Sequence, residues 1–206
     1  MGDHVLFFYG TLMAPQILHR VIHGSATPSQ WQKDLLTFRP AILHGFRRYK
    51  VRGADYPGII ASSAPGWDSA SLPGVSAAET TPTATASASV LGTVVSGLTD
   101  GDIHRLDIFE GGDYTRQKVN VRILMEALAD AHPDGGHGHG EKNSDRHLKD
   151  VLEAAGAEFA DEGEEVEAET YVWTSGRGRL GDVEWDFEAF KRDKMAWWVA
   201  ADERDW

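Results

Sequence analysis

The sequence predicts a single α+β domain, in which short strands and helices are interspersed along the chain. Its 206 residues suit one domain with a sizeable hydrophobic core. The continuous apolar run at residues 5–9 is typical of a buried strand. Ile103, Leu106 and Phe109 instead recur at the spacing of one helix face. Strand and helix patterns therefore occur together in one compact unit.

The composition disfavours several classes of protein. The formal net charge is -12, so a nucleic-acid duplex or an anionic membrane would repel the chain. Cysteine is absent, which excludes disulfides, thiolate metal sites and a cysteine nucleophile. No apolar run is long enough to span a bilayer, and no basic segment precedes the first strand as a signal peptide requires. We therefore expect a soluble, cytoplasmic protein with neither nucleic-acid nor membrane partners.

The first strand leads through a glycine turn into a helix. Residues 5–9 form the strand, Gly10-Thr11-Leu12 breaks it, and Pro15 stands where a first helical residue is expected. An apolar stripe then continues to Gly24. The backbone amides of such a turn, beside a helix N-terminus, can bind an anion such as a carboxylate. The turn alone leaves open whether it binds an anion or only joins strand to helix.

The next predicted strand carries the only dense basic cluster. Residues 35–51 have a strand pattern, with expected inward anchors at Leu43, Phe46, Tyr49 and Val51. The basic cluster consists of Arg47, Arg48, Lys50 and Arg52. It is either a solvated strand face or a site that attracts an anionic substrate to an otherwise acidic protein. A turn at residues 56–58 precedes a further short strand, and residues 90–95 resume the sheet.

The best-defined helix ends at an acidic residue. Thr99 is a suitable N-cap, Asp102 occupies the position of the capping-box acid, and Gly111-Gly112 provides the stop. Glu110 is then the last helical residue, at the negative end of the helix dipole, where a carboxylate is disfavoured. If the site is also desolvated, the pKa of Glu110 rises and the group becomes a poised general base. The alternative on local features is an exposed glutamate at a helix end.

The C-terminal part predicts two strands and a helix. Residues 114–123 alternate in polarity, with Val119, Val121 and Ile123 on one face. Residues 166–173 form the closing strand. A helix follows, beginning at residues 185–187, with a largely aromatic side that we interpret as docked core: Phe187, Phe190, Trp197, Trp198 and Ala201.

Two segments interrupt this order, and we interpret them as flexible insertions in one domain, residues 1–206. Residues 62–89 are rich in Ser, Ala, Thr, Pro and Gly, whereas residues 130–165 combine a Gly-His repeat with an acidic run. The second segment has a short helical pattern at residues 148–155. A structural zinc site needs four fixed ligands, so we expect no metal at the histidines of this segment, His132, His137 and His139.

Four stretches together resemble the γ-glutamylcyclotransferase-like, or AIG2-like, proteins. The specific combination is Phe-Tyr-Gly-Thr-Leu after the first strand, with Asp-x-Phe-Glu-Gly a hundred or so residues later. The four stretches are residues 8–12, residues 51–58, residues 106–116, and residues 168–173 with Trp185. The resemblance covers most of the chain outside the two insertions.

This resemblance implies a compact, mixed-strand β-barrel flanked by helices, with a polar cavity at one end. Glu110 would point into that cavity as the catalytic acid and base. In enzymes of this family the amine of a γ-glutamyl compound attacks its own γ-carbonyl, which gives 5-oxoproline and a free amine without a metal or cofactor. The residues that would bind such a substrate are Tyr9, Gly10, Thr11, Leu12, Arg52, Tyr56, Tyr114 and Arg116.

Two functions on this barrel are consistent with the resemblance. The first is an enzyme that cyclises a small γ-glutamyl amide. The second is a non-catalytic protein that binds a small molecule or a partner and retains the cavity. The two differ in one observable, because only the enzyme releases 5-oxoproline.

Overall fold

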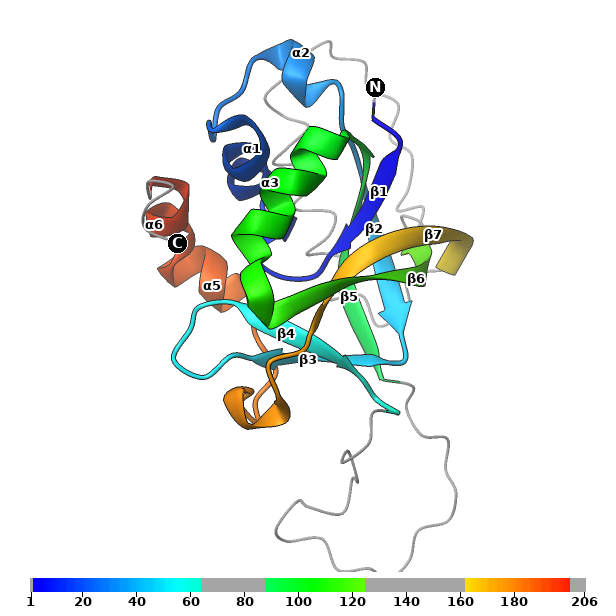
Figure 1. Ribbon diagram of the computed structural model, residues 1–206, viewed down its shortest axis with the longest axis vertical. Helices are drawn as coiled ribbons and strands as arrows, with labels where there is room; N and C mark the ends of the chain where they lie inside the picture. Colours follow the sequence, from blue (N-terminus) through cyan, green and yellow to red (C-terminus); the bar gives the residue numbers. More distant parts are fainter. Residues whose placement is uncertain (1, 64–87, 125–161, 201–206) are drawn as a thin grey trace, which may run out of the picture.

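Five strands close into a barrel in the computed structural model, which describes residues 2–63, 88–124 and 162–200. Around the barrel their order is β1-β5-β2-β6-β7 (Figure 1). Neighbouring strands pair antiparallel, except that β1 runs parallel to β7 with Leu6 opposite Glu169. The predicted mixed-strand barrel is therefore confirmed. Its strands are β1 (His4–Phe8), β2 (Thr37–His44), β5 (Ser89–Leu98), β6 (Tyr114–Leu124) and β7 (Glu162–Trp173).

Helices cover one side of the barrel, and a small two-stranded sheet lies against it (Figure 1). The small sheet pairs β3 (Phe46–Lys50) with β4 (Pro57–Ala61). The α-helices are α1 (Pro15–His23), α2 (Gln30–Lys33), α3 (Asp100–Glu110), α5 (Phe187–Asp193) and α6 (Met195–Ala200). Three single 3-10 turns complete the described elements: η1 (Thr11–Met13), η3 (Gly111–Asp113) and η4 (Arg177–Arg179). None of these helices is both long and apolar enough to cross a membrane.

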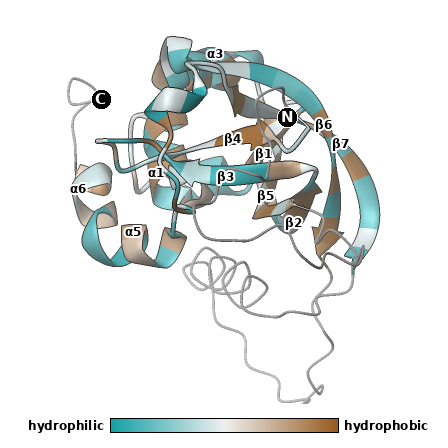
Figure 2. Ribbon diagram, turned by 90° about the horizontal axis from the view of Figure 1, so that it is seen from below, coloured by the Kyte–Doolittle hydropathy of each residue, from teal (hydrophilic) through white to brown (hydrophobic). Residues whose placement is uncertain are grey.

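Strand β1 has a core on each face, which explains its continuous apolar run. Phe7 and the following Tyr9 point into the barrel, where they pack with residues such as Val94 and Val121. Leu6 and Phe8 face outward and join a second cluster formed with the helices. In Figure 2 brown, hydrophobic segments lie around β1 and β5, whereas β6 and β7 alternate between teal and brown. The buried strand predicted from residues 5–9 is confirmed, because a strand with two buried faces needs no polar alternation.

The predicted helix signals agree with the structure. Helix α1 begins at Pro15 and ends at Gly24, whose φ of 69° is the left-handed cap conformation. In α3 the Thr99 hydroxyl accepts from the amide of Asp102, and the Asp102 carboxylate accepts from the amide of Thr99. Glu110 is the last helical residue, as the glycine pair predicted. These local signals therefore fix the end of α3, where the candidate base lies.

Two predicted strand boundaries were wrong. The strand predicted at residues 35–51 is divided into β2 and β3 at Gly45, which has a φ of 80°. Strand β7 begins at Glu162 rather than residue 166, so the acidic run assigned to the second insertion belongs to the barrel. The acidic side chains face basic partners on β2 and β6, which offsets their low strand propensity: Glu162 with His44, Glu164 with Arg39, and Glu165 with Arg122.

The C-terminal region is two short helices rather than one. Helix α5 ends at Lys194, whose φ of -128° is not helical, and α6 then starts in a new direction. Consecutive residues of a helix point about 100° apart around its axis, so Trp197 and Trp198 of α6 do not share the buried face predicted for both. Trp198 is buried, whereas Trp197 is 54 % exposed. Ala201, the last residue of that predicted face, lies outside the described residues.

Most of both predicted insertions lies outside the described residues, which omit residues 64–87 and 125–161. The second gap includes the candidate metal ligands His132, His137 and His139 and the short helical pattern at residues 148–155. Expectations about these segments therefore stay predictions.

Candidate active site

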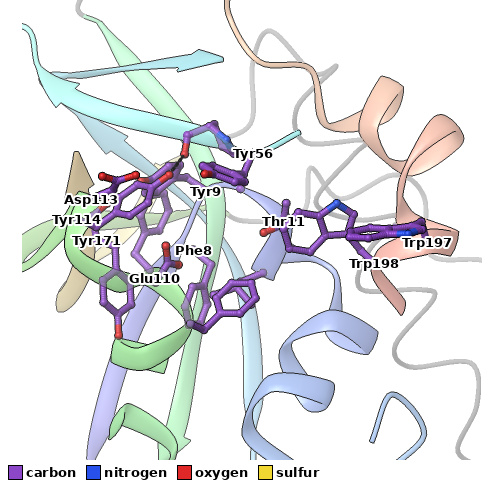
Figure 3. A pocket seen from close by; sticks show the side chains of 15 residues that line it. Phe8, Tyr9, Thr11, Tyr56, Glu110, Asp113, Tyr114, Tyr171, Trp197 and Trp198 are labelled. Atoms are coloured by element: carbon purple, nitrogen blue, oxygen red, sulfur yellow. Dashed lines mark hydrogen bonds between the residues drawn. The ribbon is translucent and has the colours of Figure 1, made fainter. Parts of the chain in front are cut away.

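A cavity of about 300 Å³ opens where the ends of several elements meet. The end of β1, the end of α3, the start of β6 and helix α6 all contribute to it (Figure 3). This volume is at the lower end of the range for small-molecule sites. The lining residues are Phe7, Phe8, Tyr9, Gly10, Thr11, Leu12, Tyr56, Pro57, Phe109, Glu110, Asp113, Tyr114, Tyr171, Trp197 and Trp198.

Glu110 supplies the cavity with a carboxyl group that has no hydrogen-bond partner among the described residues. Helix α3 ends here because Gly111, with a φ of 65°, turns the chain away from the helix axis. The residue as a whole is half-buried, and Figure 3 shows its carboxyl among the aromatic side chains of the lining. An unpaired carboxyl in such a place is available to a ligand.

The pKa of Glu110 is raised from its ordinary 4.5 to about 8. The main cause is burial, which disfavours the charged form. The negative charge of Asp107, one helical turn earlier, raises the pKa of Glu110 further. The group therefore holds its proton at neutral pH and releases it in mildly alkaline solution.

Three tyrosines surround this carboxyl, and each donates its hydroxyl hydrogen elsewhere. Tyr9 donates to the carbonyl of Tyr171 at 2.6 Å, and Tyr114 donates to the carbonyl of Pro57 at 2.7 Å. Tyr171 donates to a carboxylate oxygen of Asp107 at 2.8 Å. Burial raises the pKa of all three hydroxyls, so they stay neutral. These bonds fix the walls of the cavity and leave the Glu110 carboxyl free to react.

The turn after β1 contributes Gly10, Thr11 and Leu12 to the lining of the cavity. Its first internal hydrogen bond runs from the amide of Met13 to the carbonyl of Gly10 at 3.0 Å. The amides of Thr11 and Leu12 precede that bond, so they have no partner inside the short 3-10 turn. Gly10 itself packs against Pro57: a Cβ atom there would lie 2.8 Å from the Pro57 Cγ.

We therefore expect Gly10→Val to disrupt the cavity through protein packing as well as through ligand access. The added side chain must displace the Pro57 ring, and the Pro57 carbonyl holds the Tyr114 hydroxyl. Overpacking of this kind costs about 1–3 kcal/mol of unfolding free energy. Chemical denaturation measures the loss. Gly112→Ala is the matched control, because a Cβ at Gly112 meets nothing within 4 Å. Equal stability of the two variants would contradict the packing role.

The structure brings most of the sequence-predicted site residues to this cavity, but two arginines lie outside its lining. Glu110 is accompanied there by Tyr9, Gly10, Thr11, Leu12, Tyr56 and Tyr114. Arg52 is exposed and donates from its Nε atom to the carbonyl of Leu180 at 3.0 Å. Arg116 lies 3.8 Å from both Asp107 and Glu169. In this conformation neither arginine reaches the lining.

Three residues of the basic cluster, Arg47, Lys50 and Arg52, are exposed, which agrees with the interpretation as a solvated face, whereas Arg48 is an exception. The Arg48 side chain is 12 % exposed and donates to the carbonyl of Tyr9 at 3.0 Å. Its guanidinium also lies over the Trp185 ring, 5.6 Å from the centroid. Arg48 thus links the small sheet to the end of β1 through Tyr9, which lines the cavity.

Several lining residues were not selected from the sequence. Phe8, Pro57 and Phe109 lie within the stretches that carried the family resemblance, and their places in those stretches could have identified them as lining residues. Asp113 and Tyr171 also lie within stretches that carried the family resemblance, whereas Trp197 and Trp198 gave no local signal of a site. Within the described residues, no three side chains of the metal-ligating types gather into a possible metal site.

Comparison with known proteins shows to which family the chain is similar. The model of the family described as "Gamma-glutamyl cyclotransferase, AIG2-like" matches residues 6–68, which include the turn after β1 but not Glu110. The Arabidopsis thaliana protein AIG2 C is 25 % identical over 189 residues, which is 92 % of this chain and 73 % of that relative. The predicted resemblance to the AIG2-like family is confirmed.

Further AIG2-like relatives and solved structures match this chain at identities of 25 % or less. AIG2-like protein D of Arabidopsis thaliana is 23 % identical, over 93 % of this chain and 82 % of its own. A solution structure from the same plant is 25 % identical, covers 96 % of this chain and 78 % of that chain, and has a TM-score of 0.48. A solved gamma-glutamyl cyclotransferase has 15 % identity, coverages of 83 % and 66 %, and a TM-score of 0.41.

Proposed function

We propose that this AIG2-like protein is a cofactor-independent γ-glutamylcyclotransferase that converts a small γ-glutamyl amide into 5-oxoproline and an amine. The observation that carries the proposal is the Glu110 carboxyl, unpaired among the described residues, in a cavity lined by the turn after β1. The raised pKa suits a group that must accept a proton near neutral pH and later return it. The family relationship supports the same class of reaction.

The proposed reaction begins with the α-ammonium group of the substrate. Glu110 accepts one proton from it, and the free amine attacks the γ-carbonyl carbon to close a five-membered ring. The γ-carbonyl then re-forms as the bond to the leaving nitrogen breaks, and Glu110 returns its proton to the departing amine. The carboxylate regenerated in this way takes the second proton of the ring nitrogen, which leaves a neutral lactam, and passes it to the departing amine, which leaves as an ammonium ion. The nucleophile is part of the substrate, so the cavity contributes by selecting the folded conformer.

The turn after β1 would hold the negative part of the substrate. The amides of Thr11 and Leu12 can donate to the α-carboxylate or to the oxyanion that develops on the γ-carbonyl oxygen. The substrate ammonium would then lie beside Glu110. Because an adjacent positive charge favours the ionised carboxyl, binding would lower the pKa of Glu110 and generate the base in the complex.

The decisive experiment is an assay of 5-oxoproline by mass spectrometry. The purified protein would be incubated with γ-glutamyl dipeptides, glutathione and γ-glutamyl-lysine. Release of 5-oxoproline from any of them supports the proposal. Saturable binding without product would instead favour the non-catalytic alternative, in which the same cavity only holds a ligand.

The pH dependence of kcat/KM should follow the protonation of free Glu110. We expect kcat/KM to rise with pH up to about 8, the pKa of Glu110, and then level off. Asp107→Asn removes the negative neighbour, so the midpoint of this rise should move to lower pH. Asp100→Asn is the control, because Asp100 lies at the opposite end of the same helix. A midpoint that does not move in Asp107→Asn would contradict the electrostatic coupling.

A further inference from the structure

Two tryptophans of α6 form an end of the cavity that the proton transfer does not use. Figure 3 shows Trp197 and Trp198 on the side opposite Glu110, with Thr11 between the two sides. Trp198 is 6 % exposed, whereas Trp197 is 54 % exposed and lies at the rim. A large aromatic side chain that is exposed beside a cavity is well placed to contact a ligand.

Packing holds this end of the cavity in place. The Trp198 ring lies edge-on to the rings of Phe109 and Tyr56, with centroid distances of 6.1 Å and 6.4 Å. The ring of Phe190 on α5 also lies edge-on to the Trp198 ring, with a centroid distance of 6.2 Å. The Trp197 ring lies edge-on to the Trp198 ring as well, with a centroid distance of 5.8 Å. Such edge-to-face contacts are favourable geometries for aromatic pairs. We call Tyr56, Phe109, Trp197 and Trp198 the aromatic wall.

The charges around the cavity disfavour a negatively charged leaving group. Among the described lining residues none is lysine, arginine or histidine, and the two charged types present are acidic, at Glu110 and Asp113. The carboxylate of Asp113 accepts from Arg179 at 2.6 Å and from Ser175 at 2.5 Å. The guanidinium of Arg179 is therefore engaged. A carboxylate on the leaving group would meet apolar surface without a cationic partner, which costs free energy.

We propose that the aromatic wall binds the leaving group of the substrate, and that this group is an uncharged apolar or aromatic amine. The inference rests on the proposed cyclotransferase function and narrows its substrate class. The γ-glutamyl head lies at the Glu110 end beside the turn after β1, and the amide substituent extends along the wall toward Trp197. Preferred substrates are γ-glutamyl amides of arylalkylamines, in contrast to γ-glutamyl amino acids and peptides with a free carboxylate.

Three probe compounds with matched γ-glutamyl heads test this preference. They are γ-glutamyl-benzylamide, γ-glutamylglycine and glutathione, with 5-oxoproline release as the common readout. We expect kcat/KM for the benzylamide to exceed that for either carboxylate compound by at least about tenfold, the scale that a hydrophobic pocket provides. Trp197→Ala should lower the ratio of benzylamide to γ-glutamylglycine by about fivefold or more. Trp31→Ala is the matched control, since Trp31 is 66 % exposed on α2 and lies outside the lining.

A charge substitution tests the same inference in the opposite direction. Trp197→Arg places a cation at the rim, where the parent side chain is already half exposed, so the fold should tolerate it. This variant should raise kcat/KM for γ-glutamylglycine relative to the benzylamide. Equal or better turnover of the carboxylate compounds by the parent, or an unchanged ratio in Trp197→Ala, overturns the inference while leaving the cyclotransferase intact. Failure of all three compounds, and of γ-glutamyl-lysine as well, to yield 5-oxoproline overturns the proposed function itself.

Discussion

Glu110→Gln is expected to lower the turnover of a γ-glutamyl amide by at least about a hundredfold, because general-base catalysis contributes on that scale. Glutamine preserves the shape of the side chain but cannot accept the ammonium proton. The carboxyl has no hydrogen-bond partner among the described residues, so its replacement breaks no observed hydrogen bond in the fold. The loss should therefore appear in kcat, with folding intact.

The control for this variant is the same substitution at an exposed site. Glu188 lies on α5, where its carboxylate is 3.2 Å from Lys191 and remote from the cavity lining. Glu188→Gln should keep full turnover. Calorimetry should show that Glu110→Gln still binds the substrate within about tenfold of the parent, or about 1.4 kcal/mol. Near-normal turnover of Glu110→Gln would exclude Glu110 as the base.

The same substitution is expected to stabilise the folded protein in alkaline solution. The folded-state pKa of Glu110, about 8, lies above the ordinary value of 4.5. The folded state therefore binds the proton more tightly than the unfolded state. The contribution of Glu110 to the stability of the folded state is fully present below pH 4.5 and is lost as pH rises toward 8. Glu110→Gln removes this dependence.

The stabilisation of Glu110→Gln should amount to roughly 2–4 kcal/mol at pH 8, and to little at pH 4.5. Urea denaturation of the parent and the variant across this range measures it. Burial lowers the pKa of His19 to about 4, so stability is also lost as pH falls from 6.5, but equally in both proteins. A difference in unfolding free energy between the parent and the variant that does not change with pH would contradict the burial of the Glu110 carboxyl. A gain in stability at the expense of turnover is typical of a functional site.

Local sequence signals correctly predicted two elements of the candidate site, the end of α3 and the turn after β1. Thr99 and Asp102 defined where α3 begins and the glycine pair where it ends, so the position of Glu110 followed from helix capping alone. The turn after β1 was likewise predictable, because an apolar run interrupted by glycine before Pro15 marks strand, turn and helix. Both features depend on residues close together in the chain.

The remainder of the site depends on distant residues. Tyr171 and Trp198 reach the cavity only because β7 closes the barrel and α6 docks beside α5, and neither event has a local signal. Tyr114 and Arg116 share a face of β6, yet only Tyr114 lines the cavity. Two residues along a strand span roughly 6.6 Å, which carries Arg116 beyond the rim to the carboxylates of Asp107 and Glu169. The alternation of side chains along β6 therefore predicts which residues share a face of the strand, but not how far along the strand the cavity extends.

Titration of the Glu110 carboxyl by NMR is the most direct test of its role as a proton acceptor poised near neutral pH. Carbon-13 labelling of glutamate side chains gives one titrating signal for each residue, and the signal absent from Glu110→Gln identifies position 110. The expected midpoint is about 8 in the free protein, with a shift to lower pH when a γ-glutamyl compound is bound. A midpoint near the ordinary 4.5 in the free protein would contradict the buried, poised base.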